Sequence, residues 1–252
     1  MIKITSKENQ AYGAFNGGQI IENKPIGFPQ DGGDIRPYST LFYWAYAEAK
    51  VDSTIGLHPH QGFEIMSFVL KGTIKHYDSK QKTWIPLEAG DAQIIRAGNG
   101  IQHAEHMNEG SAMFQIWLDP NLSKTLQHEA TYSDYKANTF PTKNENGIIE
   151  TIYIGGDSPF QLFTKKTTIR TLEFSEKVEI ELDKNMLHSI YILKGNGDIS
   201  GQSFSSDAFI QVENEMTLTL EPTEKTKLFV ISSPKEMDYL TYAEQMQARM
   251  GR

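Results

Sequence analysis

Short β-rich segments separated by turn residues fill the first half of this chain, and they constrain its fold more than any other feature. Each segment is rich in β-branched and aromatic residues, and glycine, asparagine or aspartate stands between neighbouring segments. Strands at such close spacing favour a β-sandwich or β-barrel over alternating strands and helices. The pattern predicts strands at residues 63–70, 73–77, 92–95 and 112–118.

The second half of the chain returns to the same pattern after a polar stretch at residues 121–147, which predicts an irregular connection. The tail at 235–252 has helix-forming residues and no strand pattern, so it predicts a C-terminal helix. Ser233 is a suitable N-cap for that helix, and Pro234 suits its first position. The further strands predicted here are 172–180, 188–193, 209–212, 216–220 and 227–232.

An internal repeat relates the two strand-rich halves. Three landmarks occur in the same order and at nearly the same offset, which predicts two copies of one β-unit. The paired landmarks are FVLKG at 68–72 with YILKG at 191–195, Asp91-Ala92 with Asp207-Ala208, and the strand around Phe114 with the strand around Phe229.

The repeat and the polar stretch together predict the domain organisation. We expect an all-β chain with two domains and a helical tail. The predicted boundaries are an N-terminal domain at 1–130, a linker at 131–147, a C-terminal domain at 148–234 and the tail at 235–252.

Composition excludes several classes of function. The formal net charge of −8 argues against a broad nucleic-acid-binding face, so a regulatory role would act through another protein. The chain has no cysteine, which excludes disulfides, thiolate metal sites and a cysteine nucleophile. Neither a signal-peptide pattern nor an apolar stretch of the ~20 residues that span a membrane is present. We therefore expect a soluble, cytoplasmic protein.

Two short clusters of imidazole and carboxylate groups point to a metal site. His58 and His60 stand two residues apart, and so do His103 and Glu105, and residues at this spacing in a strand face the same side. If the two segments are neighbouring strands, three imidazoles and one carboxylate converge. Such ligands suit Fe, Mn, Ni, Cu or Zn and leave coordination positions open for substrate or dioxygen.

Glu64 is an alternative carboxylate for the same site. By strict alternation it shares the face of His58 and His60, so it competes with Glu105 as ligand. In the other interpretation it lies beside the site and orients an imidazole N–H group. We favour Glu105 as the ligand and Glu64 as its neighbour.

The remaining histidines and the second half carry weaker signals. His76 is expected to be a hydrogen-bonded core or rim histidine, and His106 a solvated one. The repeat places carboxylates rather than imidazoles at the corresponding positions of the second half, so we expect that domain to be structural, without a metal. The carboxylates are Glu181, Asp183 and Glu221, and Thr219 stands at the position that corresponds to His103.

Five motifs of the first half, in fixed order, are similar to those of one known family. They are HPHQGFE at 58–64, VLKG at 69–72, HYDS at 76–79, Gly90-Asp91 and AGNGIQHAE at 97–105. In these motifs the chain resembles the pirin family of the cupin superfamily. It departs from the family pattern at Gln61, Ala104 and His106-Met107, near the pocket rim, which puts an inherited substrate preference in doubt.

The resemblance implies a bicupin, with two β-barrel domains of the double-stranded β-helix or jelly-roll type. It also implies one divalent transition metal in the N-terminal barrel, held by His58, His60, His103 and Glu105. Fe(II) is the expected metal, and Mn, Ni, Cu, Co or Zn are alternatives. Bacterial members include quercetinases, which cleave flavonols with dioxygen and release carbon monoxide, and other members are regulatory partners of proteins.

Two main functions follow from this resemblance. The first is a quercetin 2,3-dioxygenase type of enzyme acting on flavonols or similar enolisable aromatics, with Glu105 or Glu64 as the base. Met66, Phe68, Phe114 and Ile116 are then candidate pocket walls. The second is a metal-containing regulatory protein without turnover; a non-redox cupin enzyme such as an isomerase is a weaker third. The aromatic segment at 41–46 could line a pocket, as an enzyme requires, or plug it.

Overall fold

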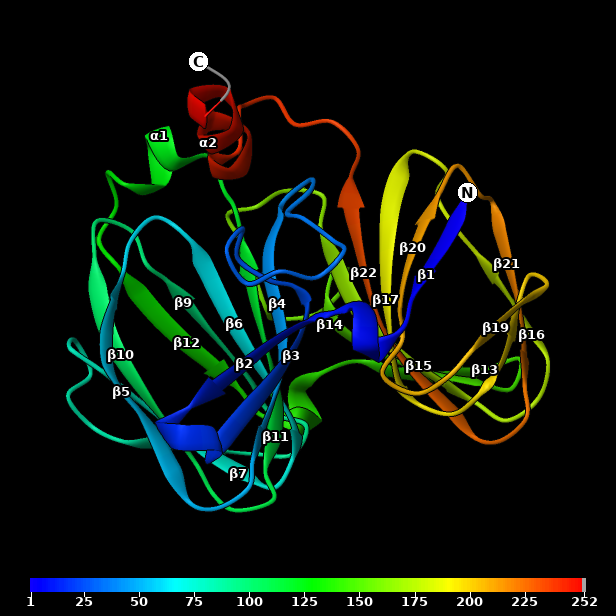
Figure 1. Ribbon diagram of the computed structural model, residues 1–252, viewed down its shortest axis with the longest axis horizontal. Helices are drawn as coiled ribbons and strands as arrows, with labels where there is room; N and C mark the ends of the chain where they lie inside the picture. Colours follow the sequence, from blue (N-terminus) through cyan, green and yellow to red (C-terminus); the bar gives the residue numbers. More distant parts are fainter. Residues whose placement is uncertain (251–252) are drawn as a thin grey trace. The chain divides into compact units, whose positions relative to one another are not determined.

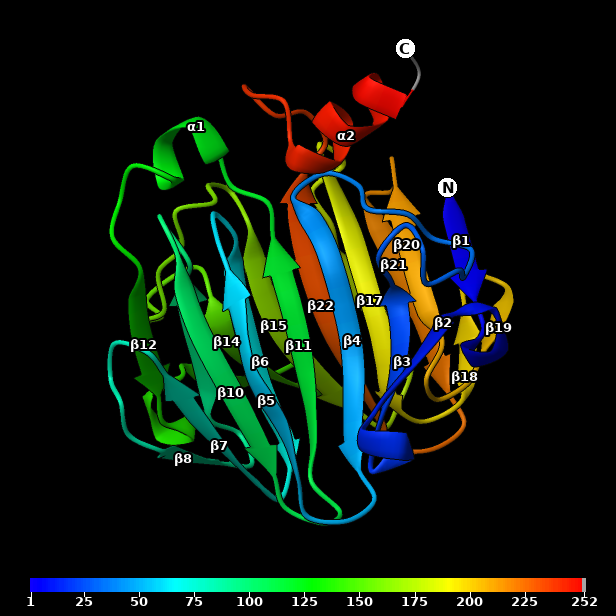
Figure 2. The same ribbon diagram turned by 60° about the vertical axis from the view of Figure 1, so that its left-hand side comes forward.

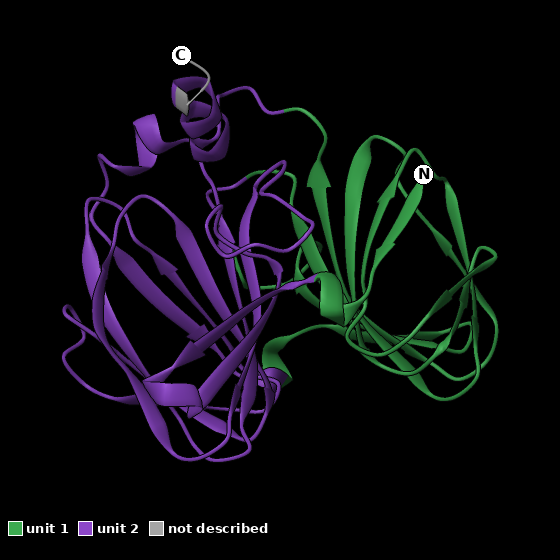
Figure 3. Cartoon of the chain, in the orientation of Figure 1, with its two compact units in different colours: residues 1–9, 138–161, 165–236 green, residues 10–137, 162–164, 237–252 purple. Residues whose placement is uncertain are grey.

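The computed structural model describes residues 1–250 and consists mainly of antiparallel β-strands (Figure 1). The chain divides into two compact units, which are coloured separately in Figure 3. The first, which we call the histidine barrel, comprises residues 10–137, 162–164 and the chain from 237 onward. The other, which we call the second barrel, comprises residues 1–9, 138–161 and 165–236.

The histidine barrel contains a seven-stranded sheet and a four-stranded sheet. In spatial order the larger sheet is β12 (Thr131–Tyr135), β9 (Ala92–Arg96), β6 (Glu64–Lys71), β11 (Ala112–Leu118), β4 (Leu41–Ala49), β3 (Ile20–Ile26) and β2 (Ala11–Phe15). The smaller sheet is β5 (Ser53–His60), β10 (Ile101–Met107), β7 (Thr73–Asp78) and β8 (Ile85–Glu88). Two short helices, α1 (Leu122–Thr125) and α2 (Tyr242–Met250), lie at the same end of this barrel in both ribbon views (Figures 1 and 2).

The second barrel repeats this arrangement. Its larger sheet is β1 (Ile2–Thr5), β20 (Phe209–Glu213), β17 (Met186–Lys194), β22 (Thr226–Pro234), β15 (Thr168–Phe174), β14 (Ile148–Ile154) and β13 (Thr142–Glu145). Its smaller sheet is β16 (Val178–Glu181), β21 (Thr217–Pro222), β18 (Gly197–Ile199) and β19 (Gln202–Phe204). Short 3₁₀ turns at Lys7–Asn9, Asn16–Gly18 and Ala137–Thr139 complete the elements of the described chain.

The matched strand order confirms two copies of one β-unit and the all-β, two-barrel fold class. The FVLKG strand β6 occupies the same place in its sheet as the YILKG strand β17, and β11 corresponds to β22. The glycine that ends each motif has a positive φ, 69° at Gly72 and 105° at Gly195. A Cβ atom at Gly72 would lie 2.5 Å from Ser111 Oγ, and one at Gly195 would lie 2.2 Å from Thr226 Oγ1. Glycine is therefore required at both turns by backbone conformation and by space.

The assignment of the N-terminal strand and of residues 131–147 differs from the sequence prediction. Residues 2–5 pair with β20, so the N-terminal strand belongs to the second barrel. The stretch 131–147 is not an irregular linker, because it contains β12, paired with β9, and β13, paired with β14. Polar strands at a sheet edge lack the alternation of apolar and polar residues by which a strand is predicted from sequence.

The C-terminal helix begins later than predicted. Ser233 and Pro234 end strand β22, and α2 starts at Tyr242. A reciprocal capping box marks the helix start, because Glu244 N–H donates to Thr241 Oγ1 and Thr241 N–H donates to Glu244 Oε2. None of the helices within residues 1–250 has the length and apolarity needed to cross a membrane.

The interior of the histidine barrel changes from apolar to polar along its strands. One end is a core of aliphatic side chains that includes Val69, Ile74, Leu87, Met107 and Met113. Two residues further along β6 and β11, the inward positions are Ser67 and Gln115, both buried. The polar residues above this core form the candidate site.

Candidate metal centre

Strands β5 and β10 bring the two predicted histidine clusters together. They are adjacent and antiparallel, with His103 directly opposite His58 and Ile101 opposite His60. The register then shifts, so that Glu105 pairs with Ile55. This places two residues of β5 opposite one residue of β10, which is a β-bulge, and bulges re-aim the side chains beside them.

The three imidazoles face a common centre. Ligand nitrogens of His58, His60 and His103 all lie within 4.8 Å of one another. The ring centroids are 4.7 Å apart for His58 and His60, 4.4 Å for His58 and His103, and 4.7 Å for His60 and His103. The structure therefore brings together three of the four predicted ligands.

The nitrogens of this cluster have the properties of metal donors. His58 Nδ1 lies 2.8 Å from the carbonyl oxygen of Gly56, which fixes the proton on Nδ1 and leaves the Nε2 lone pair free. His60 Nε2 and both ring nitrogens of His103 are buried and have no hydrogen-bond partner within residues 1–250. Buried nitrogens without partners are costly unless a ligand satisfies them.

Burial also keeps the imidazoles of His60 and His103 neutral. Loss of solvent, with a smaller contribution from the charge of His58, lowers the pKa of His60 to about 3. Burial lowers the pKa of His103 well below its usual value, and the neighbouring imidazoles add to this effect. Neutral imidazole is the form that binds a metal, so these residues fit a divalent transition metal.

Glu105 lies next to the histidine cluster on the inner face of β10. It is 1% exposed and stands opposite His76 on β7, in a register without shifts from His103 to Met107. Its Oε1 accepts a hydrogen bond of 3.1 Å from Ser67 Oγ, and its Oε2 accepts one of 2.6 Å from Gln115 Nε2. Its oxygens are not among the donor atoms that lie within 4.8 Å of one another, so its role as fourth ligand stays a prediction.

A chain of hydrogen bonds runs through Glu105 across the barrel. On one side Trp117 Nε1 donates to Gln115 Oε1, whose amide nitrogen binds Glu105. On the other side Gln93 Nε2 donates to Ser67 Oγ, and Tyr132 Oη donates to Gln93 Oε1. Burial raises the pKa of Glu105, while the charge of His76 is the largest opposing influence. The chain fixes the carboxylate from both sides.

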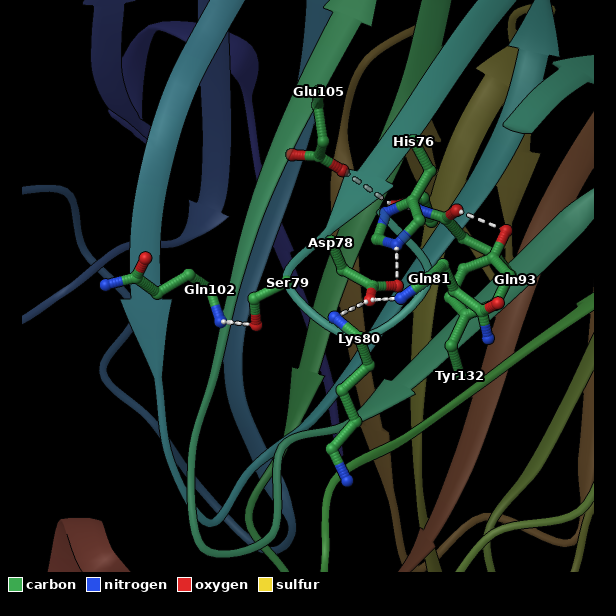
Figure 4. Close-up of polar contacts among 10 residues, drawn as sticks. His76, Asp78, Ser79, Lys80, Gln81, Gln93, Gln102, Glu105 and Tyr132 are labelled. Carbon is green, nitrogen blue, oxygen red and sulfur yellow. Dashed lines mark hydrogen bonds and ion pairs between the residues drawn. The ribbon is translucent and has the colours of Figure 1, made fainter. Parts of the chain in front are cut away.

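His76 is a hydrogen-bonded core histidine, as expected. Its Nε2 lies 2.8 Å from Asp78 Oδ2, and both side chains are fully buried (Figure 4). Asp78 Oδ1 accepts 2.7 Å hydrogen bonds from the backbone N–H groups of Lys80 and Gln81. The ring of Tyr132 stacks on His76 at 4.3 Å between centroids. Asp78 therefore fixes the orientation of this imidazole.

Glu64 does not face the histidines, which corrects the expectation from strict alternation. Its carboxylate accepts hydrogen bonds from Phe163 N, Thr164 N and Thr164 Oγ1, at 2.6, 2.8 and 2.6 Å. The alternation fails because Gly62, with φ of 81°, turns the chain between β5 and β6. Glu64 therefore holds the 162–164 segment, and we no longer consider it as ligand or base.

The predicted pocket walls also lie elsewhere. Met66 and Phe68 alternate with Ser67 on β6, and Phe114 and Ile116 flank Gln115 on β11, so these four residues occupy the opposite sheet faces. All four are at most 1% exposed, which identifies them as core residues. The two-residue alternation along a strand shows which residues share a face, but it does not show which face points into the barrel.

The histidines outside the cluster have other partners. His106 is half-buried and its Nδ1 lies 2.9 Å from Thr54 Oγ1, so it is not simply solvated. His128 is exposed and stacks on Phe163. In the second barrel, His188 is hydrogen-bonded to Ser232 Oγ and to the carbonyl of Asp183. Glu221 of that barrel pairs with Lys177.

The comparison with known families now identifies the domain that carries the cluster. Residues 34–118 match the family model described as Pirin, and this range includes all four predicted ligands. These residues are about a third of the chain, and over them the chain is similar to the pirin family. Its resemblance to the pirin family is therefore confirmed.

Curated relatives of this chain carry two kinds of name. The quercetin 2,3-dioxygenase of Escherichia coli K12 is 44% identical over 69 residues, which are 26% of this chain and 29% of that protein. The pirin-like protein of Caulobacter vibrioides is 25% identical over 205 residues, 78% of this chain and 84% of that protein. The 44% identity to the Escherichia coli quercetin 2,3-dioxygenase therefore covers less than a third of that protein.

Solved structures establish the fold over the whole chain. The bacterial pirin YhhW of Escherichia coli, solved in complex with nickel(II), superposes with a TM-score of 0.77 at 18% identity and covers 94% of this chain and 100% of its own. A quercetin 2,3-dioxygenase structure from Acinetobacter baumannii has a TM-score of 0.78 at 17% identity, over 99% of this chain and 87% of its own.

Sequence reasoning missed the residues that surround Glu105. Ser67, Gln93, Gln115 and Trp117 come from three strands, and no motif connects them. One signal was present: a glutamine or serine among apolar residues of a buried strand must find a hydrogen-bond partner inside the barrel. Its partner, however, depends on strand order.

Proposed function

We propose that this protein is a metal-dependent dioxygenase of the quercetin 2,3-dioxygenase type, acting on flavonols or similar enolisable aromatics. The observation that carries the proposal is the set of three converging imidazoles at the end of a barrel, with unpaired ring nitrogens on His60 and His103 within residues 1–250. Iron(II) is the proposed metal, and manganese, nickel, copper, cobalt and zinc are alternatives that the same ligands accept. The names of the relatives support this substrate class.

A pocket beside His60 supports an enzyme. His60 lines a pocket of about 550 Å³ together with Pro59, Gln61, Gly100, Ile101 and other residues of the β5 and β10 ends. His58 and His60 are each only partly buried. A small aromatic substrate and dioxygen could therefore reach the cluster, whereas a purely regulatory site has no need of such access.

Each residue has a separate part in the proposed reaction. His58, His60 and His103, with Glu105 as the proposed fourth ligand, would hold the metal, which would supply Lewis acidity and coordination positions for substrate and dioxygen. Glu105, held by Gln115 and Ser67, is the proposed base that takes the proton of the flavonol 3-hydroxyl group at a carboxylate oxygen. One flavonol and one dioxygen then yield one ester and one carbon monoxide, so all atoms are accounted for.

The alternative is a metal-binding regulatory protein that acts through a protein partner without turnover. The name of the pirin-like relative leaves this alternative in place. The formal charge of −8 excludes a broad DNA-binding face for either function. A cytoplasmic location remains part of the proposal for both.

Metal analysis and an aerobic assay test the proposal together. Purified protein should carry a roughly stoichiometric divalent metal, and occupancy should fall in His58→Ala and in His103→Ala, because each removes one donor. Metal-loaded protein should consume oxygen and release carbon monoxide with quercetin, and Glu105→Ala should abolish this. Unchanged occupancy in both histidine variants would refute the ligand set.

Oxygen uptake separates the two functions. Fully metallated wild-type protein that takes up no oxygen with flavonols would exclude the dioxygenase and favour the regulatory protein. The variant Glu64→Gln is a matched control, because that carboxylate contacts the 162–164 segment rather than the histidines. Its turnover per bound metal should match that of the wild-type protein.

A further inference from the structure

The histidine barrel contains a second, larger pocket with aromatic walls. Its volume is about 830 Å³, within the range of sites for small organic ligands, ~300–1,000 Å³. The main wall residues, which define what we call the aromatic pocket, are Phe28, Phe42, Phe63, Trp117, Tyr242 and Met246.

The rings of this pocket contact one another and still remain open to solvent. Phe42 lies 4.6 Å from Phe63 and 5.6 Å from Tyr242 between ring centroids, and Phe28 lies 5.3 Å from Trp117. All of them except Phe42 are only partly buried. Aromatic surface that converges on a concave space and is not covered marks a binding site.

The wall that α2 supplies is held in place by buried contacts. Asp119 Oδ2 accepts a hydrogen bond of 3.2 Å from Ala243 N, at the start of the helix. Tyr239 Oη donates to the carbonyl oxygen of Asp119, at 2.7 Å. The capping box of Thr241 and Glu244 fixes the first turn. These contacts preform the pocket, so a ligand need not order it.

Trp117 separates the aromatic pocket from the histidine cluster. One part of its ring lines the pocket, and the ring meets that of His60 edge-on at 4.7 Å between centroids. Its Nε1 is directed to Gln115, which binds Glu105. The pocket is therefore adjacent to the proposed reaction site and shares a wall with it.

The rim of the aromatic pocket is polar and carries one positive charge. Gln30, Arg36 and Gln247 line it, and all three are exposed. Arg36 Nη1 donates a hydrogen bond of 3.0 Å to the carbonyl oxygen of Gly32. An apolar floor with a polar, cationic rim complements a flat ring system with hydroxyl or phenolate groups at its edge.

We propose that the aromatic pocket binds a planar polyphenolic ligand of the flavonoid class, with its rings among the aromatic side chains and its hydroxyl groups at the rim. This proposal rests on the proposed function, because it makes the aromatic pocket a second subsite, beside the metal centre, for the same class of substrate. A peptide or a second copy of the chain would present a bulky, non-planar surface, which fits a pocket walled by flat aromatic rings less well.

Binding to metal-free protein tests the assignment separately from catalysis. The probe is apigenin, a flavone that lacks the 3-hydroxyl group and so cannot bind a metal in the manner of a flavonol. Isothermal titration calorimetry of the chelator-treated full chain should show one saturable site. Met246→Glu should weaken binding roughly tenfold or more, because it places an unpaired charge against the ligand's apolar face.

A matched variant controls for the added charge. Ala248→Glu puts the same charge on an exposed residue of α2 outside the pocket and should leave the dissociation constant unchanged. If Met246→Glu lowers the melting temperature, Phe28→Ala provides a second test, because it removes a partly exposed ring from the opposite wall. It should weaken binding by a similar factor.

Each outcome decides the assignment. Saturable binding that is lost in Met246→Glu or Phe28→Ala and retained in Ala248→Glu supports it. No saturable binding to the wild-type chain, equal binding to all variants, or a concentration-dependent dimer that Met246→Glu disrupts without apigenin binding would overturn it. Oxygen uptake with quercetin is measured separately. A protein that binds apigenin but takes up no oxygen would refute only the proposed dioxygenase activity. A protein that takes up oxygen but does not bind apigenin would refute only the assignment of the aromatic pocket.

Discussion

The carboxyl group of Asp119 should make the stability of this protein depend on pH, and the effect can be calculated from its surroundings. The residue is 1% exposed, and its Oδ1 has no hydrogen-bond partner within residues 1–250. Burial raises the pKa of Asp119 from 3.8 to about 7, although the N–H groups of Ala243 and Tyr242 oppose the shift. Asp119→Asn keeps the shape of the side chain and an acceptor for Ala243, but it cannot ionise.

The sign of the effect follows from proton binding. Because the pKa of Asp119 is higher in the folded chain than in the unfolded chain, the folded chain binds this proton more tightly. Its contribution to stability is therefore present at low pH and is lost as the pH rises from about 4 to about 7. At about 1.4 kcal/mol per pKa unit, the loss between pH 5 and pH 8 is about 2–3 kcal/mol.

Urea denaturation of wild-type protein and Asp119→Asn at pH 5 and pH 8 measures this difference. The free energy of unfolding of the variant minus that of wild type should be about 2–3 kcal/mol larger at pH 8 than at pH 5. Comparing the two proteins at each pH cancels the contributions of other titrating groups. A difference between the two proteins that is the same at both pH values would show that Asp119 ionises normally, and would refute the reasoning.

Two further predictions concern the metal site and the repeat. Gln115→Ala removes the 2.6 Å hydrogen bond to Glu105, so metal affinity measured by chelator competition should fall about 10- to 100-fold, as for other residues that orient a ligand. Gly72→Ala should lower the free energy of unfolding by about 1–3 kcal/mol, because the φ of residue 72 is 69° and the new methyl group would meet Ser111.

Control variants make both of these predictions decisive. Gln81→Ala changes an exposed glutamine whose bond to Asp78 is made by its backbone, so metal affinity should not change. Gly56→Ala adds a methyl group where nothing lies within 4 Å, and its φ is not positive, so its stability should stay close to that of wild type. If the Gln115→Ala variant binds metal as tightly as wild type, Glu105 is not a ligand. If the Gly72→Ala variant is as stable as the Gly56→Ala variant, the turn at Gly72 does not require glycine.

The wrong expectation about Glu64 came from the turn between β5 and β6. The alternation of His58 and His60 was sufficient to predict that both face the same side, because both lie within one strand. Extending the alternation to Glu64 crossed Gly62, whose positive φ reverses the chain. A rule that holds within a strand carries no information across a turn, so the face of Glu64 could be known only from the folded chain.

The helix at the C-terminus shows a similar limit. Helix-forming residues predicted its presence, but Ser233 and Pro234 lie in β22 and the helix begins eight residues after Pro234, at Tyr242. Thr241 and Glu244 form a capping box that the sequence contains, yet Ser-Pro offered a competing start signal. Pairing of β22 with β15 and β17 decided between them.

The amino-acid sequence by itself determined the strand content, the duplication and the identity of the three histidines, because each depends on spacing within a single strand or on motifs repeated along the chain. The tertiary structure alone decided that Glu105 is held by Gln115 and Ser67, that Glu64 turns away, and that α2 forms one wall of an aromatic pocket. These features depend on which strands become neighbours and on where a bulge or turn changes the direction of a side chain. Spacing along the chain does not contain that information.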